Sequence, residues 1–103
     1  MVKVTCNYQN NNIDEVTITG HANFLQLGTD IVCAAVSAIV IGTLNALDQM
    51  EKKTIKVINN KSGFVKIKVI ISTNDNQVML KTMLWQLKTI SAQYTQYLKI
   101  KEV

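Results

Sequence analysis

The sequence predicts an α+β fold, with a mainly antiparallel sheet of two hairpins and two helices in the order ββαββα, plus a possible short C-terminal strand. Two stretches alternate apolar and polar residues around polar turns, and two longer stretches repeat apolar residues at helical spacing. Hairpins separated by helices favour a sheet with helices packed against it. No linker or repeat divides the 103 residues, so we expect residues 1–103 to form a single domain.

The first predicted hairpin lies in the N-terminal fifth of the chain. Residues 2–8 alternate between apolar and polar types, which is the period of a strand with one buried face. The asparagines at 10–12 predict the turn, because asparagine tolerates left-handed backbone conformations. Val16 and Ile18 then mark the buried face of the second strand. Cys6 falls on an apolar face, and we expect it to be a small buried side chain.

The apolar stretch at 31–47 predicts the first helix. Asp30 is a good N-cap residue, so the helix should begin at Ile31. Polar residues and a glycine interrupt the stretch, and it is shorter than the ~20 residues that a membrane-spanning helix needs. We therefore expect a core helix, packed between the sheet and either another helix or a second subunit, and no membrane partner.

The second half of the chain predicts another hairpin and another helix. Residues 55–57 and 65–71 alternate around a turn at 59–63. Asn74 and Gln77 have the spacing of a capping box. The helix that follows carries an apolar stripe of Leu80, Met83, Leu84, Leu87, Ile90 and Tyr94. Packing also explains Met79 and Trp85 better than a cofactor site does.

The net charge of +4 comes from eleven lysines and no arginine. Arginine is the residue that forks onto phosphate or guanine, so its absence argues against base recognition. Five lysines alternate with apolar residues on predicted strands, where a solvated sheet face explains them: Lys56, Lys66, Lys68, Lys99 and Lys101. The charge is compatible with nucleic acid but does not indicate it.

The candidate chemistry lies within residues 20–37, which hold the one histidine and one of the two cysteines. His21 falls on the polar side at the end of the second strand. Cys33 falls in the first turn of the predicted helix, where amide groups and the positive end of the dipole favour the thiolate, although Asp30 opposes this. From spacing alone, a catalytic dyad and a chance pairing both remain open, because cysteine protease signatures do not transfer between families.

The segment between the two residues has neither helical nor strand periodicity. It carries three large apolar side chains, Phe24, Leu25 and Leu27. They either close the end of the core or form a lid or apolar subsite, with Gly28 as its pivot.

Other kinds of site receive little support from the sequence. His21, Cys6 and Asp30 do not make a coherent set of metal ligands. Gly20 and Gly28 lack the spacing of a phosphate-binding loop. We therefore expect no metal and no cofactor. The N-terminal residues lack the apolar segment of a signal peptide, so we expect a cytoplasmic protein whose cysteines are thiols.

The motif Gly-His-Ala at 20–22, followed by Gly-Thr-Asp-Ile-Val-Cys-Ala-Ala-Val-Ser at 28–37, resembles the signature of the ribosomal-processing cysteine proteases, the Prp family. The resemblance extends over essentially the whole chain. It implies that His21 and Cys33 are the catalytic pair and that Asp30 and Ser37 support the site. It also implies that the loop and substrate-binding positions are Gly20, Ala22, Phe24, Leu25, Leu27 and Gly28.

The same resemblance implies a substrate and a mode of assembly. The substrate would be the precursor of a bacterial large-subunit ribosomal protein, the one numbered twenty-seven, whose N-terminal extension is removed. The protease would be a homodimer, and direct RNA binding would not be required. The alternative is a noncatalytic, ribosome-associated module that contacts RNA or protein, which would retain salt-sensitive RNA affinity without Cys33.

Overall fold

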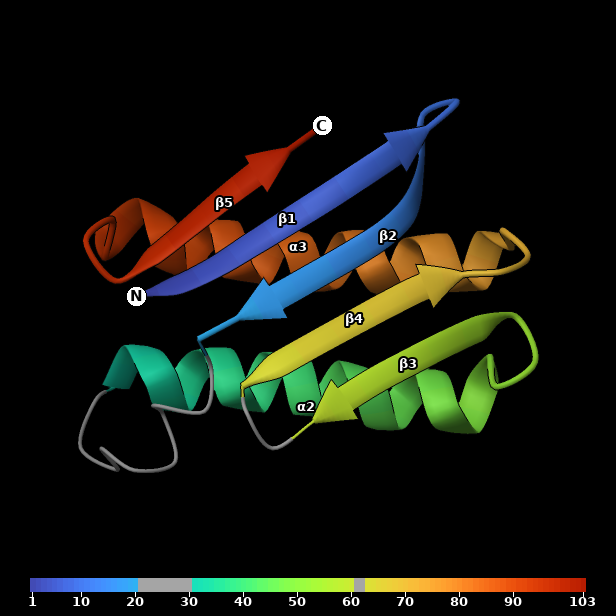
Figure 1. Ribbon diagram of the computed structural model, residues 1–103, viewed down its shortest axis with the longest axis horizontal. Helices are drawn as coiled ribbons and strands as arrows, with labels where there is room; N and C mark the ends of the chain where they lie inside the picture. The colour runs from blue at the N-terminus through green and yellow to red at the C-terminus, as the bar shows by residue number, and fades with distance from the viewer. Residues whose placement is uncertain (21–30, 61–62) are drawn as a thin grey trace.

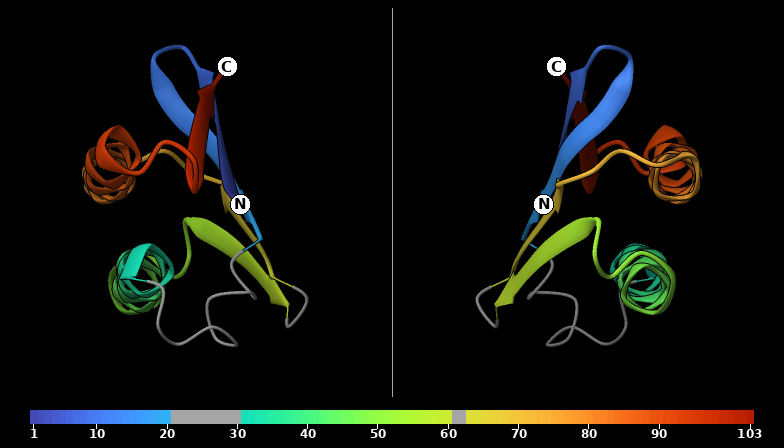
Figure 2. Two further views of the ribbon diagram at one scale, coloured as in Figure 1. Left: turned by 90° about the vertical axis from the view of Figure 1, so that its left-hand side faces the viewer. Right: turned by 90° about the vertical axis from the view of Figure 1, so that its right-hand side faces the viewer.

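Five strands and two helices form two layers in the computed structural model, which describes residues 1–20, 31–60 and 63–103 (Figure 1). The elements follow in the order β1 (Val2–Gln9), β2 (Asn12–Thr19), α2 (Ile31–Met50), β3 (Ile55–Asn60), β4 (Phe64–Val69), α3 (Asn74–Gln93) and β5 (Leu98–Glu102). This confirms the predicted α+β fold and its closing strand. Figure 2 shows both helices on one side of the sheet, and no described helix covers the other side.

The sheet has the strand order β3-β4-β2-β1-β5. Three of its four neighbouring pairs are antiparallel, and the fourth, between β1 and β5, is parallel. Helix α3 connects β4 to β5, and this crossover brings β5 to the far side of β1 in a parallel direction. The sheet is therefore mixed but mainly antiparallel, with the first strand between the second and the last.

The first hairpin closes with a turn of two residues. Asn10 and Asn11 have φ of 53° and 67°, in the left-handed region that the sequence suggested. Asn12, which we had assigned to the turn, instead begins β2 and pairs with Gln9. The turn is thus one residue shorter than predicted.

The core lies between the sheet and the two helices. Cys6, Val16 and Ile18 are fully buried, as the alternation predicted. The stripe on α3 is also confirmed, since Leu80, Met83, Leu84 and Leu87 are buried, while Ile90 and Tyr94 pack partly against the core. Among the residues that we assigned to packing, Met79 is half-buried but Trp85 is 66% exposed.

Helix α2 begins at Ile31, as predicted, but it is 20 residues long. By length and composition it could cross a membrane, so our argument from its shortness was wrong. In this fold, one side of the helix packs into the core. The buried residues on that side are Val32, Cys33, Val36, Val40 and Leu47. Ile41 on the opposite side is 45% exposed.

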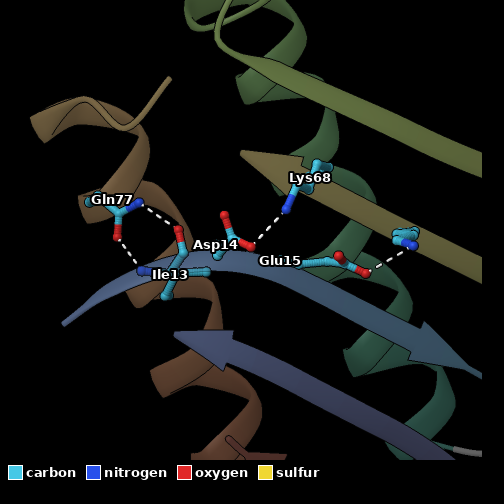
Figure 3. Close-up of polar contacts among 6 residues, drawn as sticks. Ile13, Asp14, Glu15, Lys68 and Gln77 are labelled. Carbon is cyan, nitrogen blue, oxygen red and sulfur yellow. Dashed lines mark hydrogen bonds and ion pairs between the residues drawn. The ribbon is translucent and has the colours of Figure 1, made fainter. Parts of the chain in front are cut away.

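The capping box of α3 starts one residue earlier than predicted. Thr73 is the N-cap: its Oγ1 accepts from the Asn76 amide at 3.0 Å, and Asn76 Oδ1 accepts from the Thr73 amide at 3.1 Å. Gln77 is thereby left for another role. Its side chain accepts from the Ile13 amide at 2.8 Å and donates to the Ile13 carbonyl at 2.9 Å (Figure 3). Gln77 therefore joins α3 to β2.

The second strand of the second hairpin ends two residues earlier than the alternation over 65–71 indicated. Strand β4 ends at Val69, and Ile70 and Ile71 are both more than half exposed. Their amides instead donate to the Thr54 carbonyl at 2.8 and 3.2 Å, which turns the chain away from the sheet. The apolar character of these two isoleucines therefore did not indicate a longer strand.

Candidate active site

Cys33 is the third residue of α2 and lies in its first turn, where the sequence placed it. Amide groups of the first turn of a helix have no intrahelical acceptor and carry the positive end of the dipole, which favours an anion there. No acidic residue lies within the first turn of α2. The Cys33 side chain is nonetheless 7% exposed and contacts the core.

The other predicted catalytic residue falls outside the described residues. The structure describes neither His21 nor Asp30, and the same holds for the loop positions Ala22, Phe24, Leu25, Leu27 and Gly28. The pairing of His21 with Cys33 therefore stays a prediction, as do the cap role of Asp30 and the substrate role of the loop.

The end of β2 and the start of α2 lie on either side of this segment in the sequence. Figure 1 shows that β2 ends and α2 begins at the same end of the molecule. Gly20 follows the last residue of β2, and its amide donates to the Gly63 carbonyl at 3.0 Å, which ties it to the start of β4. The residue before His21 is thus anchored to the sheet at the end of the fold where Cys33 lies.

Gly20 has a role that the sequence did not define. Its φ is +88°, and a Cβ atom built on it would lie 2.5 Å from the Met1 carbonyl oxygen. Both the backbone conformation and the space therefore require glycine. A role for Gly20 in the substrate loop stays a prediction, and the contacts that the structure describes are with Met1 and Gly63, next to β1 and β4.

The positions of Cys6 and Cys33 in the fold indicate which of the two thiols is the better candidate for the nucleophile. Cys6 is 0% exposed on β1, and burial raises the pKa of its thiol, which keeps the thiol protonated. Contact with the Tyr8 hydroxyl acts in the opposite direction but is the smaller effect. The two cysteines are not joined in a disulfide. Both cysteines contact the core, but only Cys33 lies in the first turn of a helix, so Cys33 is the candidate nucleophile.

Ser37 lies one turn after Cys33 on α2 and is partly buried. This is the position that we predicted for a supporting residue, although a supporting role stays a prediction. In the part of the chain that the structure describes, no group of three or more His, Cys, Asp or Glu side chains is arranged to hold a metal ion.

Comparison with known proteins gives a consistent match. The family profile described as cysteine protease Prp matches residues 1–99. A ribosomal processing cysteine protease Prp from Staphylococcus aureus is 34% identical over 91 residues, which cover 85% of both chains. Proteins of the same name from Bacillus subtilis and Mycoplasma pneumoniae are 30% and 29% identical, and the alignments cover 81% and 99% of this chain.

Solved structures resemble the whole fold. The S. aureus Prp protease in complex with a covalently linked product peptide superposes with a TM-score of 0.88, at 28% identity and with full coverage of both chains. The same protease with a substrate peptide gives a TM-score of 0.85 at 27% identity, again with full coverage of both chains. The matched residues include Cys33 and its helix. The chain therefore belongs to the Prp family of cysteine proteases.

Proposed function

We propose that this protease removes the N-terminal extension of a bacterial large-subunit ribosomal protein, the one numbered twenty-seven, with Cys33 as nucleophile and His21 as general base. The observation that carries the proposal is the place of Cys33 in the first turn of α2, whereas Cys6 is enclosed in the core with a raised pKa. Family membership supports the same assignment, and the relatives are named ribosomal processing proteases.

The proposed reaction proceeds through an acyl-enzyme. His21 takes the proton of the Cys33 thiol, and the sulfur attacks the carbonyl carbon of the scissile peptide bond. Amide groups of the first turn of α2 stabilise the oxyanion. His21 then donates its proton to the leaving amine, and water hydrolyses the thioester to release the new carboxylate and the thiol. No cofactor is required by this sequence of steps. A crystal structure of the S. aureus relative holds a covalently linked product peptide, which supports covalent chemistry for the family.

The two cysteines provide a matched test. Cys33→Ala should abolish cleavage of a peptide that spans the end of the ribosomal extension, with a loss of at least about a thousandfold in rate. Cys6→Ala should keep most of the activity, since its thiol does not reach the substrate. His21→Ala should also be inactive yet folded. Mass spectrometry of the products measures each outcome, and cleavage by Cys33→Ala at the parent rate would disprove the mechanism.

We further propose that the protease acts in the cytoplasm as a homodimer. The outer side of the helical layer supports a second subunit, because Ile41 on α2 and Val78 and Trp85 on α3 are 45%, 55% and 66% exposed. Val78 also lines a groove between the two helices. Sedimentation equilibrium should give twice the monomer mass for the parent and the monomer mass for Val78→Glu. A monomeric parent at micromolar concentration would refute the dimer.

A further inference from the structure

The uncovered face of the sheet carries the net charge of the molecule. Strand register places six lysines on this face, alternating with residues that face the helices: Lys3, Lys56, Lys66, Lys68, Lys99 and Lys101. Two carboxylates, those of Asp14 and Glu15, share the face, which leaves four positive charges, equal to the net charge of the chain. Figure 1 looks directly onto this face.

The rest of the described molecule is balanced in charge. Four lysines and four carboxylates lie on the helices, the helix ends and the inner side of β5. They are Lys52, Lys53, Lys81, Lys88, Asp48, Glu51, Asp75 and Glu102. The positive charge is therefore a property of one face and not of the surface as a whole.

The centre of the uncovered face is neutralised internally. Lys68 Nζ lies 2.7 Å from Asp14 Oδ2, and Lys66 Nζ lies 3.0 Å from Glu15 Oε1 (Figure 3). The β1–β5 side differs, because Lys3, Lys99 and Lys101 have no carboxylate within ion-pair distance among the described residues. We call these three residues the lysine cluster.

The arrangement of the lysine cluster is costly in a free sheet. Lys3 on β1 lies directly opposite Lys99 on β5, and like charges in opposite positions destabilise a sheet. Lysines on an edge strand also prevent pairing between sheets, which accounts for Lys99 and Lys101. It does not account for Lys3, because β1 is an interior strand. A bound anion would remove the repulsion.

Hydroxyl groups surround the lysine cluster. Thr19 is in register with Lys3, Thr5 with Lys101, and Thr17 with Thr5, and all three threonines are half-buried on the same face. Lysine and threonine are both common phosphate contacts. Opposite residues on neighbouring strands are about 4.8 Å apart and alternate residues on one strand about 6.6 Å, so the three lysines form a compact group. Such a group suits successive phosphates of one strand.

We propose that the lysine cluster and its threonines bind the phosphate backbone of single-stranded RNA without reading its sequence. The absence of arginine removes the bidentate contacts that distinguish bases. The choice of RNA among polyanions rests on the proposed function in ribosomal protein processing. Cys33 lies in the other layer, on α2, so RNA on this face leaves the active site open to a precursor.

The test measures binding of a fluorescein-labelled 20-nucleotide oligouridylate by fluorescence anisotropy at 50 and 200 mM KCl. Three contacts to single-stranded phosphates predict a log–log salt slope of about −2, or about a 16-fold loss of affinity over this range. The triple variant Lys3→Gln, Lys99→Gln, Lys101→Gln should lose at least about tenfold in affinity at 50 mM and most of the salt dependence. Its melting temperature should equal or exceed that of the parent, since the repulsion is gone.

The matched control is Lys52→Gln, Lys53→Gln, Lys81→Gln, which removes the same charge from outside the uncovered face. We expect its affinity to stay within about threefold of the parent. Equal losses in both triple variants, or no salt-sensitive binding by the parent, would overturn the proposal. Displacement of the RNA by an equal concentration of a 20-residue polyglutamate would overturn it in favour of an acidic protein partner.

Cleavage assays separate this proposal from the proposed function. The lysine-cluster variant should cleave the precursor peptide at the parent rate, and Cys33→Ala should bind RNA as the parent does. If the parent binds RNA but does not cleave the precursor peptide, the proposed function is contradicted and the RNA-binding proposal is not. If the parent cleaves the peptide but does not bind RNA, the RNA-binding proposal is contradicted and the proposed function is not.

Discussion

Gly20 lies between the end of β2 and the segment that contains His21. Its left-handed backbone and its contact with the Met1 carbonyl leave no room for a side chain. Because Gly20 also donates to Gly63, its backbone position is held from two sides. Substitution should therefore affect both stability and the place of the neighbouring histidine.

Gly20→Ala should destabilise the protein by about 2 kcal/mol, from the left-handed backbone and the clash with a backbone oxygen. Gly42→Ala is the matched control. Nothing lies within 4 Å of a Cβ atom at that position in α2, so it should stabilise the helix by about 0.5–1 kcal/mol. Chemical denaturation measures both. Equal effects of the two substitutions would show that Gly20 is not constrained.

At the scale of single residues, the sequence predicted where a residue lies within its helix or strand better than it predicted which distant residues surround it. The helical start at Ile31 placed Cys33 in the first turn, and strand alternation placed Cys6 in the core. Local sequence decides both, an N-cap residue before the helix in one case and strand alternation in the other, which is why they were predictable. The constraint on Gly20 was not predictable, because Met1 and Gly63 are distant in sequence and meet Gly20 only in the folded sheet.

At the scale of elements, α3 depends on a buried polar contact with β2. Gln77 is 6% exposed and satisfies both the amide and the carbonyl of Ile13. Ile13 lies where the β1–β2 register shifts, so the sheet ladder does not provide the usual partners there. The side chain of one helix thus completes the hydrogen bonding of a strand.

Gln77→Leu should cost about 2–4 kcal/mol, because two buried backbone groups lose their partners. Gln86→Leu on the exposed side of the same helix should change stability by less than about 0.5 kcal/mol. Thermal unfolding followed by circular dichroism distinguishes them. A melting temperature of Gln77→Leu within a degree of that of the parent would show that water replaces the amide.

The elements themselves were predictable from periodicity, but their ends and partners were not. Apolar spacing identified α2 and α3, and alternation identified the strands. The cap of α3 was misplaced because both Thr73 and Asn74 are suitable N-cap residues, and the one that caps depends on Asn76. The parallel pairing of β5 with β1 depends on the path of α3 across the sheet, which local pattern does not contain.

At the scale of the whole molecule, two carboxylates connect elements and make stability depend on pH. Glu51, just after α2, accepts from Thr73 Oγ1 at 2.5 Å and Thr54 Oγ1 at 2.8 Å, and these hydrogen bonds lower its pKa. Contact with Lys88, and then a hydrogen bond from Tyr8, lower the pKa of Glu102 on β5, against the effect of burial.

The sign of the pH effect follows from these directions. A carboxylate whose pKa is lower in the folded state stabilises the protein above its unfolded pKa of about 4.3, and that stability is lost as the pH falls through the folded value. The parent should therefore lose stability below about pH 5. Glu51→Gln and Glu102→Gln should each flatten this loss, and Asp48→Asn, exposed near the end of α2, should not. Melting temperatures measured from pH 3 to 7 give the loss of stability for each protein. The same pH dependence in all three variants would contradict the roles assigned to Glu51 and Glu102.

The parallel pairing of β1 with β5 also has a consequence for biosynthesis. One side of β1 pairs with residues 98–102, so the sheet cannot be completed until those residues have left the ribosome. Until then, β1 offers an unfilled hydrogen-bonding edge to any neighbouring nascent chain. A chain truncated before residue 98 should therefore aggregate more, as measured by light scattering, than one that includes residues 98–102.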